Sequence, residues 1–197
     1  MANVFLDLGT HYGQGLREFI QRFNMNDSWI IHTFEANPIT HKIFISQYHK
    51  QTPWVTSHNK AITDHNGEIQ VNIETPPGEG ETGMGTSIID LERWNPWNGE
   101  LRENFLSTAN VPCIDLSEFI ISNFKKEDNI IVKMDIEGSE YDTLTKLIKT
   151  QAIEYINFIT VEWHSRFFTN KNEIEKIEEN LIQELKKYDK LILESWK

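Results

Sequence analysis

Residues 4–15 read Val-Phe-Leu-Asp-Leu-Gly-Thr-His-Tyr-Gly-Gln-Gly, an apolar run that ends at three closely spaced glycines. A run of this length and composition is typical of a buried strand. From residue 14 to residue 24 the apolar side chains recur at helical spacing, so a helix is expected to follow the glycines. A strand that turns through glycines into a helix predicts an α/β protein with a parallel sheet.

The same alternation of apolar runs and helical patterns continues along the chain. Further strands are expected at residues 29–34, 54–62 (one strand and its exit), 67–73, 130–135, 156–163 and 191–193. Further helices are expected near residues 38–48, 115–124, 138–148 and 172–188. Parallel strands joined by crossover helices predict an α/β, doubly wound, Rossmann-like, mostly parallel sheet with helices on both faces.

The 197 residues contain no repeat and no linker that would divide two domains, so we expect a single domain over residues 1–197. Residues 76–110 differ from the rest, because they combine a Pro-Pro pair, several glycines and the tryptophans Trp94 and Trp97. Connections of this length are more often functional lids than idle linkers. We therefore expect an insertion or lid on the substrate side of the ligand site.

Lys plus Arg is 19 against 30 for Asp plus Glu, which gives a formal net charge of −11. This balance argues against nucleic acid as a partner, since each phosphate contact needs a cation. The single cysteine, Cys113, excludes an internal disulfide and suits a reducing compartment. The N-terminus does not resemble a secretory signal, and no apolar stretch approaches the ~20 residues that cross a bilayer. We therefore expect a cytoplasmic protein without a membrane span.

The turn around Gly9 and Gly13 suits a ligand of the nucleotide type, because glycines let the backbone turn tightly and come close to a ligand. Glu35 ends the next predicted strand, 28 residues after Asp7. A carboxylate at that place can accept hydrogen bonds from both hydroxyls of a ribose. The alternative is a plain turn followed by an exposed glutamate, and the position of Glu35 favours ligand binding.

A second group of polar side chains follows two other predicted strands, with Asp135 and Glu137 after one and Glu162 and His164 after the other. Neighbouring strands lie about 4.8 Å apart, and ligands of open α/β sheets bind at the carboxyl ends of the strands. Three carboxylates this close raise one another's pKa unless a cation is present. In the alternative, Glu137 caps the following helix and His164 is a hydrogen-bonded rim residue; Glu140 is assigned mainly to such a cap.

The pattern Asp7-x-Gly9-x-x-x-Gly13 resembles the first motif of class I S-adenosylmethionine-dependent methyltransferases. Further motifs follow in the order seen in the FkbM-type methyltransferase family, so the resemblance covers about residues 4–164. They are Phe34-Glu35-Ala36-Asn37-Pro38, Asn59-Lys60-Ala61-Ile62, Val132-Lys133-Met134-Asp135-Ile136-Glu137-Gly138-Ser139-Glu140 and Val161-Glu162-Trp163-His164. Thr10-His11 departs from the Ala-Asn that is common in the family, and the tail lacks the last antiparallel strand of the usual seven-stranded sheet.

The resemblance implies a class I methyltransferase fold with S-adenosyl-L-methionine as its cofactor. The residues that it implies around this cofactor are Asp7, Gly9, Thr10, His11, Gly13, Glu35, Ala36, Asn59, Ala61 and Asp135. Glu35 would hold the ribose, the glycine turn would surround the amino acid part, and residues 59–61 would lie near the adenine. For Asn59, a role as a turn residue is an equal alternative.

The leading hypothesis is an O-methyltransferase whose acceptor is a carbohydrate or another small molecule with a hydroxyl group. A sugar hydroxyl is a poor acid, so a general base or a metal that lowers its pKa is needed. We expect Glu137 or His164 as the base, with Asp135 and Glu162 orienting the acceptor or holding Mg²⁺. Mechanisms with and without Mg²⁺ both stay open at this point.

Trp94 and Trp97 are candidates for binding the acceptor, because tryptophan offers a flat apolar face to a sugar ring; they would equally well form the small core of the insertion. Two other functions are alternatives. An RNA ribose methyltransferase conflicts with the net charge of −11. A catalytically silent cofactor-binding partner subunit conflicts with the carboxylates at both strand ends. The identity of the acceptor and the oligomeric state do not follow from the sequence.

Overall fold

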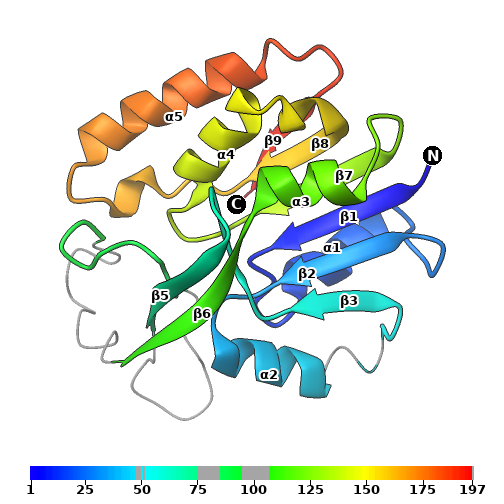
Figure 1. The fold of residues 1–197 in the computed structure, drawn as a ribbon, viewed down its shortest axis with the longest axis horizontal. Coiled ribbons are helices and arrows are strands. Elements are labelled where there is room, and N and C mark those ends of the chain that lie inside the picture. Colours follow the sequence, from blue (N-terminus) through cyan, green and yellow to red (C-terminus); the bar gives the residue numbers. More distant parts are fainter. Residues whose placement is uncertain (48–49, 51, 75–84, 95–106, 197) are drawn as a thin grey trace.

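The computed structural model describes residues 1–47, 50, 52–74, 85–94 and 107–196, and its centre is a six-stranded parallel sheet (Figure 1). In spatial order the strands are β3 (Val55–His58), β2 (Ile30–Phe34), β1 (Asn3–Leu8), β7 (Asn129–Met134), β8 (Ile156–Val161) and β9 (Ile192–Ser195). β1 occupies the middle because residues 4–8 are buried from both sides. This arrangement confirms the predicted α/β, mostly parallel architecture.

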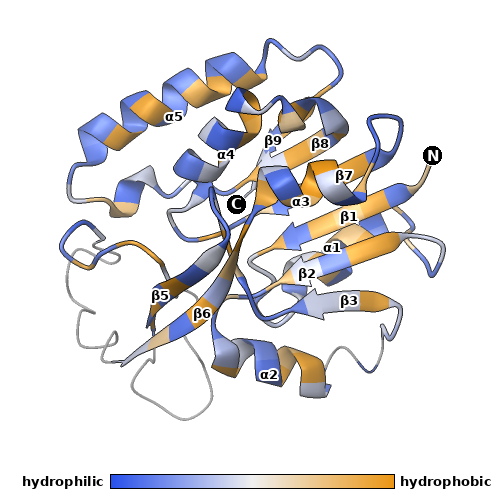
Figure 2. Ribbon diagram, viewed as in Figure 1, coloured by the Kyte–Doolittle hydropathy of each residue, from blue (hydrophilic) through white to orange (hydrophobic). Residues whose placement is uncertain are grey.

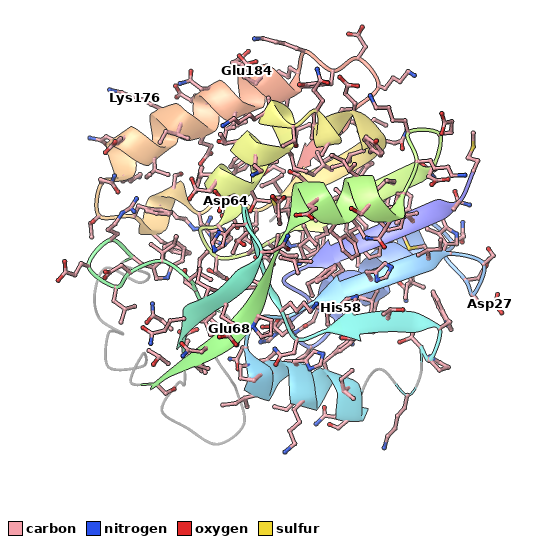
Figure 3. The ribbon with its side chains drawn as sticks, in the orientation of Figure 1. Asp27, His58, Asp64, Glu68, Lys176 and Glu184 are labelled. Atoms are coloured by element: carbon pink, nitrogen blue, oxygen red, sulfur yellow. The ribbon has the colours of Figure 1, made fainter. Side chains whose placement is uncertain are left out.

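Helices cover both faces of the sheet, as the doubly wound pattern predicts. One face carries α1 (Gln14–Arg22) and α2 (Pro38–Gln47), and the core between them and the sheet includes Phe5, Phe19 and Phe44. The opposite face carries α3 (Leu116–Asn123), α4 (Glu140–Lys149) and α5 (Lys171–Leu185), which enclose the larger core. Apolar residues concentrate in the strands (Figure 2), while Lys176 and Glu184 of α5 point away from the sheet (Figure 3).

A second, three-stranded sheet has the order β4 (Ala61–Thr63), β6 (Ser107–Asp115) and β5 (Gly67–Ile73), with β5 and β6 antiparallel. It corrects the prediction of one strand and its exit over residues 54–62. The chain leaves the main sheet at His58 and enters the small sheet at Ala61, so residues 59 and 60 form the junction between the two sheets. The arrowheads of β1 and β2 point toward the small sheet in Figure 1.

Within the expected insertion at 76–110, the structure describes residues 85–94 and the start of β6. The first of these segments spans from the small sheet to the chain that follows β8, since Ser87 bridges to Asn72 of β5 and Trp94 bridges to Phe168. Trp97 lies outside the described residues. None of the described helices is long and apolar enough to cross a membrane.

The turn after β1 requires glycine at position 9 for two reasons. Gly9 has a φ of 77°, and a Cβ at this position would lie 1.6 Å from the backbone oxygen of Asp135. The carbonyl belongs to the neighbouring strand end, so it has little room to move. The glycine therefore fixes how closely the ends of β1 and β7 approach each other.

We predict that Gly9→Ala lowers the free energy of unfolding by more than about 3 kcal/mol, because positive φ alone costs about 1–2 kcal/mol and the steric overlap adds to it. Gly67→Ala is the matched control: Gly67 has a φ of 154°, and a Cβ there would meet nothing within 4 Å. Urea unfolding of the two variants separates the loss of stability caused by steric overlap from the loss caused by a positive φ. Equal losses in the two variants would contradict the close approach of β1 and β7.

Candidate functional site

The carboxyl ends of β1, β2, β7 and β8 surround a cavity of about 410 Å³. Its volume lies in the range of pockets that hold cofactors and other small molecules. The cavity is lined from the main sheet by Gly9, Thr10, His11, Phe34, Glu35, Ala36, Lys133, Asp135, Ile136, Glu137, Glu162 and His164. It is completed by Gln14, Gly15, Lys60, Ala61, Ile62, Gly85, Thr86, Ile88, Arg166, Phe167 and Trp196. The structure thus brings both sequence-predicted groups of polar residues into one cavity.

The turn after β1 is tied to the end of β2. The backbone N–H groups of Gly9 and Thr10 both donate to the carbonyl of Phe34 at 3.0 Å. The next backbone N–H, that of His11, donates to Oε2 of Glu35 at 2.8 Å. The first turn of the chain is therefore built on the residues that follow the second strand, which is why the two predicted motifs share one wall of the cavity.

The Glu35 carboxylate is held by backbone groups on both of its oxygens. His11 N–H donates to Oε2, and Asn37 N–H donates to Oε1 at 2.8 Å. Burial raises the pKa of Glu35 to about 7, although these two N–H groups oppose the shift. Because the pKa is raised in the folded protein, Glu35 contributes to stability below its ordinary pKa and loses this contribution as the pH rises through about 7. The fold therefore keeps at the cavity wall a carboxylate whose ionisation lowers the stability of the folded protein.

Asn59 takes the role of a turn residue rather than that of a wall residue. Its Nδ2 donates to the carbonyls of Glu35 at 2.8 Å and Ala36 at 3.2 Å. Glu35 N–H donates in turn to the carbonyl of His58, which is labelled on β3 in Figure 3. Asn59 thus fixes the loop that carries Glu35, while its neighbours line the cavity. This result favours the alternative that the sequence left open for Asn59.

Lys133 forms the floor of the cavity, and its importance was missed from the sequence. It is buried, and its Nζ donates to the Gly9 carbonyl at 2.9 Å and to Oδ2 of Asp135 at 3.2 Å. The same Nζ lies 3.5 Å from Oδ1 of Asp7. Burial lowers the pKa of Lys133, but Asp135 and Asp7 outweigh this effect and raise it. A lysine between two apolar positions of a buried strand was the available signal, because a buried cation needs anionic partners.

Asp7 and Gly13 were expected to contact the cofactor, and the structure places neither of them on the cavity wall. Asp7 is fully buried beneath the floor, where burial raises its pKa and the Lys133 ammonium opposes the shift. Gly13 has a φ of 79°, and a Cβ there would lie 2.9 Å from the Phe44 ring. Both residues shape the turn after β1: Asp7 holds Lys133, and Gly13 lets α1 begin against α2.

His164 stands at the centre of the second group of polar residues. Its Nε2 lies 3.5 Å from Oε2 of Glu137, 3.7 Å from Oε1 of Glu162 and 3.8 Å from Oδ1 of Asp135. On the other side of the ring, Nδ1 lies 3.0 Å from Oε1 of Glu140. Burial lowers the pKa of His164, but Glu140 and the other carboxylates raise it to about 10. The imidazole therefore supplies the positive charge that the carboxylates need.

Glu137 has an unusual backbone that a segment of the insertion holds in place. Its φ of 51° lies in the left-handed region, and its carbonyl accepts a hydrogen bond from Oγ of Ser87 at 2.5 Å. Burial is the main cause that raises the pKa of its side chain well above the ordinary value. Strained backbone of this kind is most common at functional sites. Ser87 was not identified from the sequence.

Trp94 corrects the expectation of an exposed stacking surface for the acceptor. Its side chain is fully buried and packs edge-on against Phe167 and Phe168, with ring centroids 5.5 and 5.2 Å apart. A Cβ on Gly138 would lie 2.8 Å from the Trp94 ring. Trp94 therefore belongs to the large core of the main fold, beneath the Glu137 loop, and not to a separate small core of the insertion. The Trp94 ring is buried because it fills the space that Gly138, which has no side chain, leaves open.

Asp135, Glu162 and His164 offer a set of possible metal ligands, with one ligand atom each, and these atoms all lie within 4.8 Å of one another. Arg166 donates from Nη2 to Oε1 of Glu162 at 2.8 Å and from Nη1 to the Trp163 carbonyl at 2.7 Å. The two carboxylates suit a divalent cation such as Mg²⁺ or Mn²⁺, the imidazole is a ligand typical of transition metals, and the nearby arginine limits the negative charge. The cluster can thus balance its charge with a proton on His164 or with a metal.

A model of the FkbM methyltransferase domain matches residues 7–190 of the chain. The chain belongs to the FkbM methyltransferase family. Among solved structures, it is similar to the crystal structure of methyltransferase FkbM from Methylobacillus flagellatus KT, with 13% sequence identity and a TM-score of 0.43. That match covers 76% of this chain and 30% of the solved chain, so this chain spans about a third of its length. A search of curated proteins found no match.

The buried ion pairs of Lys133 lead to a stability prediction. We expect Lys133→Met to lower the free energy of unfolding by about 3–5 kcal/mol, because it leaves the fully buried Asp7 without its cation. The double variant Asp7→Asn/Lys133→Met removes charge from both partners and is expected to recover a large part of the loss. Urea unfolding of the three proteins measures both effects. A single variant as stable as the parent protein would contradict this account of the cavity floor.

Proposed function

We propose that this chain is an S-adenosylmethionine-dependent O-methyltransferase that acts on a hydroxyl of a sugar or of another small molecule. One observation carries the proposal: a single cavity has the Glu35 carboxylate on one wall and the cluster around His164 on another. The Glu35 carboxylate suits the binding of a ribose, and the cluster around His164 suits the deprotonation of a hydroxyl group. Membership of the methyltransferase family supports the assignment of a methyl donor to this cavity.

The cofactor is proposed to lie over the turn after β1, with its ribose at Glu35. Each Glu35 oxygen accepts a backbone N–H and has a further lone pair that a ribose hydroxyl can use. Lys60, Ala61 and Ile62 line the adjoining wall, where the chain crosses between the two sheets. Mixed apolar and polar lining of this kind suits a purine ring with a few directed hydrogen bonds. The residues present therefore fit the proposed cofactor.

When S-adenosylmethionine is bound, its sulfonium supplies an electrophilic methyl group, and the C–O bond to the acceptor forms as the C–S bond breaks toward sulfur. The protein must align the hydroxyl with this methyl group and take up its proton. We propose Glu137 as the proton acceptor, because its carboxylate lines the cavity and burial raises its pKa. A carboxylate with a raised pKa is a stronger base than an exposed one. His164 is the alternative base.

Asp135, Glu162 and His164 are the residues that would hold a divalent cation such as Mg²⁺. A bound cation would lower the pKa of the acceptor hydroxyl. In the mechanism without a metal, protonated His164 balances the charge of the carboxylates 3.5 to 3.8 Å from its Nε2. With or without a metal, the proton of the acceptor hydroxyl is taken up by Glu137 or His164, at the carboxyl ends of β7 and β8.

The lining of the cavity supports a sugar as the substrate class. Arg166, Phe167, Trp196 and Gln14 belong to this lining, so the cavity offers aromatic rings together with guanidinium and amide groups. Rings of this kind stack on the apolar face of a sugar, while amide and guanidinium groups bind its hydroxyls. The net charge of −11 opposes an RNA acceptor. The proton-accepting cluster opposes a purely cofactor-binding role.

The direct test is methyl transfer. The protein is incubated with S-adenosylmethionine and a panel of methyl glycosides, polyols and short RNA, and mass spectrometry follows S-adenosylhomocysteine and the gain of one methyl group on an acceptor. Glu137→Gln is the matched variant, which removes the base and keeps the shape of the side chain. Methylation of a glycoside by the parent protein alone supports the proposal. Methylation of RNA alone, or equal turnover by the variant, would overturn the acceptor class or the base.

The ribose contact predicts a loss of cofactor affinity in Glu35→Ala. We expect S-adenosylmethionine binding to weaken by about 1–3 kcal/mol, the scale of hydrogen bonds to a charged group. Calorimetric titration of the folded variant measures the change. Asp64→Ala serves as the control, since Asp64 is an exposed carboxylate that does not line the cavity. An unchanged dissociation constant in Glu35→Ala would rule out the ribose contact.

The raised pKa of Glu35 predicts a pH dependence with a definite sign. The protonated form is favoured below about 7, while the ribose hydroxyls need the ionised form, so affinity falls as the pH drops through about 7. Below that point we expect a loss of about tenfold for each pH unit, until the total loss reaches the ~1–3 kcal/mol expected for Glu35→Ala. Titrations of the parent protein and of Glu35→Gln across this range check the prediction. Parallel pH profiles in the two proteins would assign the dependence to another group.

The proposed cation site predicts that EDTA abolishes methyl transfer and that Mg²⁺ restores it. Asp135→Asn removes one ligand and is expected to raise the Mg²⁺ concentration needed for restoration by about 10-fold or more. The assay is the methyl transfer measured above, with and without added Mg²⁺. Full activity in EDTA would eliminate the metal and leave the mechanism in which protonated His164 balances the charge.

A further inference from the structure

Glu140 is fully buried, and its carboxylate contacts two backbone N–H groups and one ring nitrogen. Oε1 accepts from the backbone N–H of Ile136 at 2.8 Å and lies 3.0 Å from Nδ1 of His164, while Oε2 accepts from the backbone N–H of Gly138 at 2.9 Å. It is the first residue of α4, so part of its role is the helix cap that the sequence predicts. The contact with His164 goes beyond that role, and Glu140 does not line the cavity.

The contact between Glu140 and His164 needs one shared proton. Two of the three groups around the carboxylate are backbone N–H donors, which cannot accept a hydrogen bond in return, so Oε2 has no place for a proton. An amide at this position would place its NH₂ group against one of these N–H groups. The proton between Oε1 and Nδ1 belongs to the ring because imidazole is a stronger base than a carboxylate, and the hydrogen bond is therefore charge-assisted.

The two nitrogens of His164 consequently have different environments. Nδ1 faces the buried Glu140, while Nε2 faces the three carboxylates of the cavity at 3.5 to 3.8 Å. Trp94 and Phe167 pack beside the ring, with centroids 6.0 and 5.9 Å away. Packing limits the tilt of the ring, but only Glu140 distinguishes one nitrogen from the other on its buried side.

We propose that Glu140 is the positioning residue of the site: it keeps the Nδ1 proton of His164 inside the protein and thereby presents Nε2 to the cavity. Carboxylates that hold a histidine in this way fix its tautomer and direct its other nitrogen to a metal or to a substrate proton. The inference rests on the proposed function for its consequence in catalysis. The placement of the proton itself does not depend on which reaction the cavity performs.

The loop between β7 and α4 explains how Glu140 both holds the backbone of this loop and positions His164. Glu140 pulls the N–H groups of residues 136 and 138 inward, which shapes the loop that carries Glu137. The same carboxylate reaches across to the end of β8, where His164 lies. A single side chain thus sets the relation between the ends of β7 and β8. Loss of Glu140 is expected to affect the cluster and to spare the wall that carries Glu35.

The test is NMR of the metal-free and cofactor-free protein labelled with ¹⁵N-histidine, with the His164 signals assigned from His164→Gln. We expect the parent protein to keep a slowly exchanging, downfield Nδ1 proton at every pH at which it is folded. In Glu140→Gln we expect that proton to move upfield and to exchange faster. A parent protein whose His164 carries its proton on Nε2 alone would overturn the proposal without any variant.

Asp115→Asn is the matched control, because Asp115 is also a buried capping carboxylate, which accepts from the N–H groups of Ser117 and Glu118 at the start of α3. It should lose stability and leave the His164 signals unchanged. Mn²⁺ binding, followed by electron paramagnetic resonance, should weaken about 10- to 100-fold in Glu140→Gln, with S-adenosylmethionine affinity unchanged. A variant that keeps the parent Nδ1 signal and Mn²⁺ affinity would show that Glu140 is only a helix cap. Absence of Mn²⁺ binding in both proteins contradicts the metal site alone, and the Nδ1 signal still decides the proposal.

Discussion

The buried ammonium of Lys133 is the interaction on which the rest of the cavity depends. It joins the Gly9 carbonyl, Asp135 and Asp7, so it ties the turn after β1 to the end of β7 from below. One glycine follows from this contact, because a Cβ on Gly15 would lie 2.8 Å from Lys133 Cε. The spacing of the glycine turn thus makes room for a protein side chain as well as for a ligand. A buried cation can occupy the centre of a parallel sheet only when carboxylates meet it there.

Above Lys133, the site contains more carboxylates than positively charged side chains. Four carboxylates surround His164, and Arg166 contacts one of them from the rim. Each carboxylate is held by a different neighbour: Asp135 by Lys133, Glu162 by Arg166 and Glu140 by backbone N–H groups. Glu137 has His164 as its main opposing charge. Burial raises the pKa of Glu137, and the charge of His164 opposes this shift.

The sequence predicted the order of the elements and the meeting of the two polar groups, because both follow from strand periodicity and from the rule that parallel strands end at one edge. It could not separate wall residues from supporting residues. Asp7, Gly13 and Asn59 lie within the motifs but do not line the cavity, because they contact Lys133, the Phe44 ring and the backbone of residues 35 and 36. Trp94 and Ser87 contact residues far along the chain, and Glu140 reaches from one strand end to another. Such contacts leave no periodic signal.

The bridge between Ser87 and the Glu137 carbonyl has a consequence for protein engineering. The segment at residues 85–94 carries Ser87, and its Ile89 and Trp94 pack where a Cβ on Gly138 would lie. It is therefore part of the scaffold of the main fold and cannot be exchanged as an independent cassette. A chimera that imports this segment from a relative must also import a hydroxyl at position 87 and a bulky ring at position 94. Recombination points that keep residues 85–94 together with residues 136–140 preserve the left-handed backbone of Glu137.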